Sequence, residues 1–259
     1  MKSPVDEMAS IEGKHALVTG GGRGIGRAIA AALTAAGASV SIMGRGEKTL
    51  AEAVGAGAAA GYVIADVTDV AAVNAAVKQA AAARGPVDLL IANAGTATAV
   101  PFAKATPDQF RDMFEQHVLG MMHPAQAVLG DMIKRGFGRI VAVASIVALR
   151  ASPNVSPYTT AKHAMLGLVR SIAVETAGTG VTVNAVCPGF VDTDLIRGTV
   201  EQMVKRGTSR EEAMSRFTSQ VPVGRLVTPQ EVAEAVLYFC SPAAGAATGA
   251  TLVIGADGA

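Results

Sequence analysis

The sequence of 259 residues predicts an α/β fold, with one doubly wound parallel sheet of about seven strands and helices on both faces. Two observations predict it. Short runs rich in β-branched residues alternate with Ala-rich segments from one end of the chain to the other. These runs are continuously apolar and lack an alternation of period two, as expected for strands that are covered on both faces.

The predicted elements follow one another in a regular order. The apolar β-branched runs are residues 15–20, 38–44, 61–67, 87–95, 138–145, 180–189 and 249–255. The helical segments between them are residues 24–36, 69–84, 107–135, 157–177 and 229–240. No repeat and no linker rich in Pro, Gly or Ser divides the chain, so we expect a single domain over residues 1–259.

Residues 192–222 break this alternation. They are polar, charged and helical in character, and they separate the sixth predicted strand from the last predicted helix. An excursion of about thirty residues in a compact domain is typically a lid or a binding loop. We therefore expect a helical substrate lid here, with a decorative surface helix as the alternative.

Composition excludes several functional classes. The formal net charge is +1, from 22 basic and 21 acidic residues, which argues against nucleic acid and against a polybasic membrane anchor. No apolar stretch is long enough for a membrane span, and the first residues lack a signal-peptide core. Cys187 and Cys240 show no pairing pattern, so we expect a reducing, cytoplasmic compartment and no metal site.

A glycine-rich turn, "TGGGRGIG" at residues 19–26, joins the first predicted strand to the first helix. A diphosphate needs backbone N–H groups and no Cβ in the way, and a helix N-terminus supplies both. Gly20, Gly24 and Gly26 therefore predict a dinucleotide site, although their spacing differs from the general fingerprint. A merely tight strand-to-helix connection is the alternative.

The end of the second predicted strand indicates which nicotinamide cofactor is preferred. An acidic residue there would accept from both ribose hydroxyls and repel a 2′-phosphate. The sequence instead has Gly44 followed by Arg45, and Arg23 of the glycine turn could lie on the same side. A guanidinium binds a phosphate through two hydrogen bonds. We therefore expect NADP(H) to be preferred, with NAD(H) as the alternative.

Tyr158 stands four residues before Lys162, within "SPYTTAKHAML". On a helix this spacing places both side chains on one face. A phenol with a pKa of about 10 carries protons poorly at neutral pH, and a neighbouring ammonium lowers that pKa. The pair is a candidate acid/base unit, although the same spacing also arises by chance.

Taken together, the motifs are similar to those of a family. The chain resembles a short-chain dehydrogenase/reductase of the single-domain, Rossmann-like type, from about residue 11 to residue 259. The motifs that carry the resemblance are Thr19–Gly26, "ADV" around Asp66, "NAG" at 93–95, Ser145, Tyr158 with Lys162, "PGFVDT" at 188–193 and the terminal "TGATLVIGADG".

The resemblance implies a catalytic set of Ser145, Tyr158 and Lys162. Ser145 would hold the substrate oxygen, and Tyr158 would give or take the substrate's hydroxyl proton while the cofactor carries the hydride. Lys162 would bind the nicotinamide ribose and, together with the cationic oxidised ring, lower the pKa of the phenol.

The resemblance also implies cofactor contacts at several strand ends. Asp66 would accept from the adenine amino group, Asn93 would line the adenine ribose, and Thr193 would hold the carboxamide. Pro188 and Gly189 would shape the nicotinamide pocket. The remaining cofactor contacts that it implies are Ile25, Val67, Ala94, Gly95 and Val191.

Two positions depart from the family pattern. Ala92 replaces an asparagine before Asn93, which we expect to matter little. In "EQHVLGMM", His117 stands where the family has its fourth catalytic residue, an asparagine that helps to hold a water in a proton relay. Imidazole can donate and accept, and with an unperturbed pKa near about 6.5 it could pass protons itself. A bulky residue that fills space beside the site is the alternative.

We therefore expect an NADP-dependent oxidoreductase that interconverts a secondary alcohol and a ketone. The lid resembles those of hydroxy-acid and hydroxyacyl-thioester dehydrogenases, and it combines apolar side chains with basic ones, which suits a substrate with an acidic or thioester tail. A reductase of a neutral cyclic or aromatic ketone is the first alternative, and a non-catalytic NADP-binding regulatory subunit is the second. The resemblance implies a homotetramer, with a homodimer as the alternative.

Overall fold

The computed structural model describes residues 10–256. Its centre is one seven-stranded sheet in the order β3-β2-β1-β4-β5-β6-β7, and every pair of neighbouring strands is parallel. The strands are β1 (His15–Thr19), β2 (Ser39–Gly44), β3 (Gly61–Ile64), β4 (Leu89–Ala92), β5 (Gly138–Val143), β6 (Val181–Pro188) and β7 (Thr251–Ile254). The predicted fold class is confirmed.

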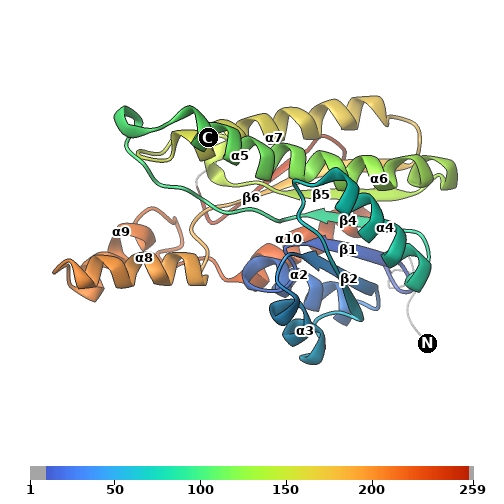
Figure 1. Ribbon diagram of the computed structural model, residues 1–259, viewed down its shortest axis with the longest axis horizontal. Coiled ribbons are helices and arrows are strands. Elements are labelled where there is room, and N and C mark those ends of the chain that lie inside the picture. Colours follow the sequence, from blue (N-terminus) through green and yellow to red (C-terminus); the bar gives the residue numbers. More distant parts are fainter. Residues whose placement is uncertain (1–9, 257–259) are drawn as a thin grey trace.

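Helices cover both faces of this sheet (Figure 1). The α-helices are α2 (Gly24–Ala35), α3 (Glu47–Gly55), α4 (Val70–Arg84), α5 (Pro107–Phe114), α6 (Gly120–Arg135), α7 (Ser156–Glu175), α8 (Asp194–Lys205), α9 (Arg210–Thr218) and α10 (Pro229–Cys240). None of the helices within residues 10–256 combines the length and the apolar character that crossing a bilayer requires.

The strand side chains point alternately into two separate cores, because successive residues of a strand face opposite sides of the sheet. Ala16 and Val18 of β1 belong to the core beneath α2 and α10. Leu17, between them, belongs to the core beneath α4, α6 and α7. Since both faces are buried, the continuous apolar runs in the sequence are explained.

The long helix expected over residues 107–135 is not uniform. It consists of α5 and α6 joined by a π-helical turn, Glu115–Leu119, which inserts one wider turn into the helix. Its start is well defined, because Thr106 and Gln109 form a reciprocal capping box. Such π-turns occur frequently at functional sites.

The helix α3 was not expected from the sequence. It lies between β2 and β3, and its buried face is formed by Leu50 and Ala53. These two apolar residues are three positions apart, which is a helical spacing, but the segment is too short and too polar to show a longer pattern.

Residues 192–222 form α8 and α9, which project from the sheet (Figure 1). Both ends of the excursion meet at one point, where Val191 and Val227 form an isolated parallel bridge. The Asp192 amide donates to the Val227 carbonyl at 2.8 Å, and the Val227 amide donates to Phe190 at 2.9 Å. The excursion is therefore a loop closed at its base.

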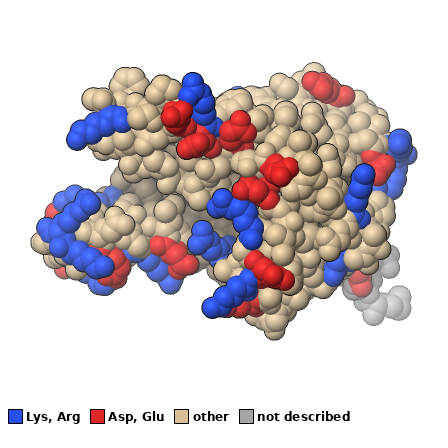
Figure 2. All heavy atoms as spheres, in the orientation of Figure 1, with Lys and Arg blue, Asp and Glu red and all other residues tan. Residues whose placement is uncertain are grey.

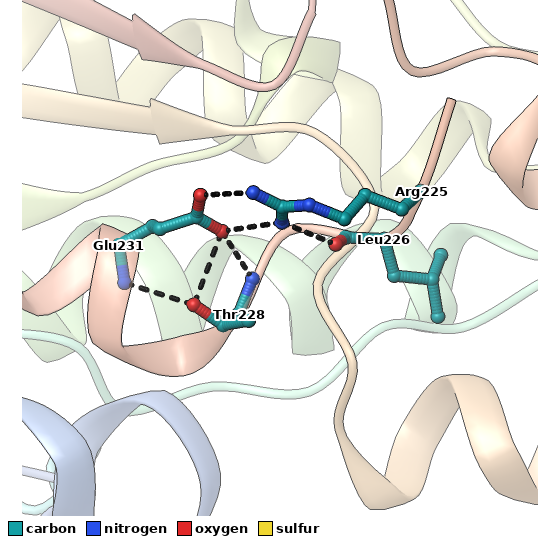
Figure 3. A network of polar contacts seen from close by, with 4 residues as sticks. All are labelled: Arg225, Leu226, Thr228 and Glu231. Carbon is teal, nitrogen blue, oxygen red and sulfur yellow. Dashed lines mark hydrogen bonds and ion pairs between the residues drawn. The ribbon is translucent and has the colours of Figure 1, made fainter. Parts of the chain in front are cut away.

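A polar network secures the return of this excursion to α10 (Figure 3). Arg225 donates to both carboxylate oxygens of Glu231, at 2.9 and 2.7 Å. The Thr228 amide donates to the same carboxylate at 2.8 Å, and Thr228 caps α10. The Arg225 guanidinium, followed by the Thr228 amide, lowers the pKa of Glu231 to about 2.

Candidate active site

A cleft of about 1130 Å³ lies at the carboxyl ends of the strands, where open α/β sheets bind their ligands. The expected site residues that line it are Gly20, Arg23, Gly24, Ile25, Gly26, Arg45, Asp66, Val67, Asn93, Ala94, Gly95, His117, Tyr158, Lys162 and Thr193. Segments far apart in the sequence are therefore brought together as expected.

Four expected residues do not line this cleft. Ser145 stands just behind it and hydrogen-bonds the Tyr158 hydroxyl. Pro188 is buried at the end of β6, paired with Ile254 of β7. Gly189 and Val191 follow it at the base of the projecting excursion, where Val191 is 6% exposed.

The glycine turn has no room for side chains. A Cβ on Gly26 would collide with the Gly20 carbonyl oxygen and with the Asn93 amide. Gly20 has a φ of +67°, a conformation that side chains other than glycine rarely adopt. The Asn93 amide nitrogen donates to the Thr19 and Gly20 carbonyls at 3.0 and 3.3 Å, which ties the end of β4 to the turn.

This turn fits a dinucleotide diphosphate, because it opens α2 and leaves its backbone accessible. The cleft volume of about 1130 Å³ accommodates a cofactor of that size. The residues that would hold the diphosphate are Gly20, Gly24, Ile25 and Gly26. The Asn93 side chain braces the turn as well as lining the cleft, which is a role that the sequence did not suggest.

Arg45 and Asp66 lie side by side in the cleft. The Arg45 Nη1 is 3.4 Å from the Asp66 Oδ2, and the guanidinium is 75% exposed. Partial burial tends to raise the pKa of Asp66, but hydrogen bonds from Thr68 and the charge of Arg45 outweigh it, and the net shift is downward. An ionised Asp66 and an exposed Arg45 are compatible with an adenine amino group and a 2′-phosphate respectively.

Tyr158 and Ser145 are joined by a hydrogen bond between their side chains. Desolvation raises the pKa of Tyr158 to about 12, and the hydrogen bond to Ser145 only partly opposes it. The expected lowering by Lys162 together with the oxidised nicotinamide ring stays a prediction. At neutral pH the phenol keeps its proton, which is the state needed to protonate an alkoxide formed from a ketone.

Lys162 is buried close to Tyr158. It is 3% exposed, and its Nζ donates to the Val143 carbonyl at 2.9 Å. Burial lowers its pKa to about 7, so it is only partly charged at neutral pH. The Nζ lies 5.7 Å from the centroid of the Tyr158 ring.

His117 is buried between the π-turn and the loop after β4. Its Nε2 lies 2.7 Å from the Thr96 carbonyl oxygen, and its ring packs edge-on against Tyr158 with centroids 5.2 Å apart. Burial, and then the charge of Lys162, lower its pKa to about 3. The ring is therefore neutral near pH 7, and the expected proton transfer through an ionisation near 6.5 is not supported.

Several polar residues of the cleft escaped sequence analysis. Thr68 donates to Asp66 through both its amide and its hydroxyl, at 3.0 and 2.9 Å. Thr96 donates through its hydroxyl to Gln116 at 2.8 Å, and both line the cleft. Their positions directly after predicted strands or beside His117 were the only signal that could have identified them.

Known proteins are similar to this chain over nearly its whole length. The family described as short chain dehydrogenase matches residues 14–204. An acetoacetyl-CoA reductase of Rhizobium meliloti is 37% identical over 237 residues, which is 92% of this chain and 95% of the relative. The structure of a variant of actinorhodin polyketide ketoreductase with NADPH superposes with a TM-score of 0.87 at 36% identity, covering 93% of this chain and 95% of that one. L-Sorbose reductase from Gluconobacter frateurii, with NADPH and L-sorbose, has a TM-score of 0.91 at 26% identity and covers 96% and 98%.

Proposed function

The chain belongs to the short chain dehydrogenase family, and on that basis we propose that it is an NADP-dependent oxidoreductase that interconverts a secondary alcohol and a ketone. The observation that carries the proposal is the meeting of Ser145, Tyr158 and Lys162 beside a cleft that also contains the glycine turn and Arg45. The bound nicotinamide cofactor supplies the hydride.

The roles of the protein side chains follow from their positions. Tyr158 holds a proton on its hydroxyl at neutral pH and delivers it to the substrate oxygen in the direction of ketone reduction. Ser145 hydrogen-bonds that hydroxyl and, from the same place, orients the substrate oxygen. We infer that Lys162, whose Nζ lies 5.7 Å from the centroid of the Tyr158 ring, helps to restore the proton to Tyr158. His117 packs edge-on against the Tyr158 ring and so helps to hold it in position.

For the substrate, we propose a 3-oxoacyl thioester. The acetoacetyl-CoA reductase and the polyketide ketoreductase both point to this chemistry. We also propose that residues 192–222 act as the substrate lid of a single domain. Leu195 of α8 lines the cleft and is 57% exposed, and Phe190 packs edge-on against Phe217 of α9. These side chains offer an apolar wall to an acyl chain.

A neutral ketone remains the second candidate, because the charges of the lid favour it. Arg197, Arg210 and Arg216 are each paired with a lid carboxylate, at 2.6 to 2.8 Å. They are therefore less available to an anionic tail, and of the five basic residues in 192–222 only Lys205 and Arg206 lie outside these pairs. L-Sorbose, bound by one of the similar structures, is a neutral ketone.

The decisive experiment compares substrates and cofactors on the purified protein. Acetoacetyl-CoA and L-sorbose are each offered with NADPH and with NADH, and absorbance at the reduced nicotinamide band is followed. We expect the highest kcat/KM for acetoacetyl-CoA with NADPH. Faster turnover of L-sorbose would favour the neutral ketone. Tight NADPH binding without turnover of either ketone would favour a non-catalytic regulatory subunit.

We propose a homotetramer for the assembly, with a homodimer as the alternative. The faces of α5 and α7 leave a depression of about 290 Å³, in which Phe110 and Phe114 are accompanied by Ala161. Phe114 is 42% exposed, and an exposed phenylalanine in an apolar depression indicates a surface that contacts another protein chain. Light scattering at micromolar concentration tests this, since a stable monomer would exclude it. A cytoplasmic location stays a prediction.

A further inference from the structure

Two of the four histidines lie on the continuous helix formed by α5, the π-turn and α6, which we call the helical rod. They bind the backbone of two different loops of the cleft. His117 belongs to the π-turn and His123 to α6, and they are 3% and 8% exposed. The loop after β4 and the loop after β3 are their respective partners. Both loops line the cleft that we assign to the cofactor.

The first contact joins the π-turn to the loop after β4. His117 Nε2 lies 2.7 Å from the Thr96 carbonyl oxygen, and the neighbouring Gln116 accepts a hydrogen bond from the Thr96 hydroxyl. The fit is close, because a Cβ on Gly95 would collide with the imidazole ring. Two consecutive residues of the π-turn thus hold one residue of the cleft wall.

The second contact joins α6 to the loop after β3. His123 Nδ1 lies 2.9 Å from the Val67 carbonyl oxygen. Here too the packing is close, since a Cβ on Gly120 would lie 2.8 Å from the Val67 side chain. Val67 and its neighbour Asp66 line the cleft, whereas His123 does not. His123 can therefore affect the cofactor only through this loop.

The two contacts fix which ring nitrogen carries a proton. A carbonyl oxygen only accepts hydrogen bonds, so His117 must be protonated on Nε2 and His123 on Nδ1. The other nitrogen of His117, Nδ1, is buried without a partner among the described residues. A ring that already donates from Nε2 and has no acceptor near Nδ1 is held as one neutral tautomer.

We propose that His117 and His123 are positioning residues that fasten the loops after β4 and β3 to one helical rod, and so set the affinity for the adenosine part of NADPH. The proposal rests on the proposed function for the identity of the ligand. The π-turn shifts the residues on either side of it by one position relative to a continuous α-helix, so that each histidine reaches its own loop. The two histidines act through the loop backbones rather than on the reacting atoms.

The first test needs no substitution. Nitrogen-15 NMR of the imidazoles in the uniformly labelled wild-type protein reports the protonated ring nitrogen of each histidine. At pH 7 we expect His117 with its proton on Nε2 only and His123 with its proton on Nδ1. His15 is also buried, and its Nδ1 lies 2.7 Å from the Gly85 carbonyl oxygen, so its signal must be told apart from that of His123. Single-residue variants, His163→Gln and His15→Gln, assign the exposed histidine and His15 by their missing signals. Rapid exchange of the His117 and His123 rings between tautomers would overturn the proposal.

The second test exchanges the two amide isosteres. The side-chain nitrogen of Gln occupies about the place of Nε2, and that of Asn about the place of Nδ1. His117→Gln and His123→Asn keep the donor, whereas His117→Asn and His123→Gln misplace it. We expect the Kd for NADPH, measured by fluorescence titration, to rise about 3 to 10-fold only in the second pair, as for one lost hydrogen bond.

The kinetic readout separates this role from a general loss of structure. For His123→Gln, the KM for NADPH should rise by the same factor while kcat at saturating NADPH stays within about twofold of the wild type. The matched control is His163→Gln, whose ring bonds only to Thr159 of its own helix and is exposed. An equal Kd for NADPH in all four isosteric variants would refute the positioning role.

The outcome also distinguishes this proposal from the proposed function. If no ketone is turned over but the crossed pattern of NADPH affinities appears, the proposed activity is wrong and the two histidines still position the loops. If turnover with NADPH is found and the crossed pattern is absent, the activity stands and the positioning role fails. Should a variant not fold, the tautomers of the wild-type protein still decide the question.

Discussion

The wall of the cofactor cleft and the projecting excursion of α8 and α9 are built by different interactions. In the wall, buried side chains bind backbone groups, as Asn93 does with the glycine turn and His117 with Thr96. In the excursion, the polar contacts are exposed ion pairs between charged side chains, such as Arg210 with Glu201. Figure 2 shows basic side chains gathered on this projection, at the left of the view, and a hollow between it and the part of the molecule above it.

Because of this difference, the two regions should not tolerate amino-acid substitutions equally well. A buried hydrogen bond to the backbone has few substitutes, because an unpaired polar group in a dry site is costly. An exposed ion pair contributes little and can be replaced almost freely. We infer that the cofactor wall is rigid and specific, while the lid can adapt to different ketones without loss of the fold. The following predictions test this contrast, from the largest effect to the smallest.

The largest effect is expected at Tyr158. Tyr158→Phe keeps the ring that packs against His117 but removes the hydroxyl that carries the proton. General acid–base catalysis contributes about 10² to 10⁴-fold, so kcat should fall by at least that factor while the Kd for NADPH is unchanged. The control is Tyr238→Phe on α10, half-exposed and outside the cleft, which should keep full activity. More than a tenth of the wild-type kcat in Tyr158→Phe would defeat the assignment.

The second effect concerns acid stability and His117. Burial holds the pKa of His117 at about 3 in the folded chain, against 6.5 for the unfolded chain. Between these values the unfolded chain binds the extra proton, so the free energy of unfolding should decrease as the pH falls from 6.5 towards 3. At about 1.36 kcal/mol per pKa unit, the loss reaches a few kcal/mol.

His117→Asn has no group that titrates in this window, and therefore isolates the contribution of the imidazole. Urea unfolding at pH 7 and at pH 4.5 measures it for both proteins. The wild type should lose more stability than His117→Asn over this interval. His15, whose pKa is also lowered by burial, is common to both proteins and cancels in the difference. Equal losses would place the His117 ring in water rather than in the described contact.

Much of the fold could be predicted because its signals are local. Strand runs buried on both faces show directly in the sequence, as "HALVT" in β1 does, and α10 was expected over the residues it occupies. The π-turn was not expected, because no residue type distinguishes a π-turn from an α-helix in a continuous helical pattern. The helix α3 was missed because Leu50 and Ala53 are its only buried residues and its N-terminus lacks a side-chain cap.

The site was predicted in its residues but not in its electrostatics. The glycine turn could be identified because a backbone that tolerates no Cβ leaves its mark in the sequence. The protonation states depend instead on burial by distant segments, which a spacing of four residues does not report. Burial raises the pKa of Tyr158 and lowers that of His117, and neither effect could be predicted from the sequence. The catalytic assignments themselves stay predictions.

The third effect concerns the specificity of the wall. Arg45→Ser removes the exposed guanidinium beside Asp66 and should weaken the preference for NADPH over NADH. A charge-assisted hydrogen bond contributes about 1.5 to 3 kcal/mol, which corresponds to a change of roughly 10 to 150-fold in the ratio of kcat/KM values. Arg27→Ser is the matched control, because Arg27 is exposed on α2 and does not line the cleft. An unchanged ratio in Arg45→Ser would show that Arg45 is not a phosphate ligand.

The smallest effect is expected in the excursion, where Arg210 and Glu201 join α9 to α8 at 2.6 Å. Both side chains are about half exposed or more, so Arg210→Gln should lower the free energy of unfolding by only about 0.2 to 1 kcal/mol. Because Arg210 is already neutralised by Glu201, its loss should also leave the KM for acetoacetyl-CoA unchanged. Lys205→Gln and Arg206→Gln are the informative partners, since these cations are not held by a lid carboxylate. If they raise that KM while Arg210→Gln does not, the lid recognises an anionic tail through its unpaired charges alone. If none of the three changes it, substrate binding depends on the apolar side chains of the lid, and the neutral ketone gains support over the thioester.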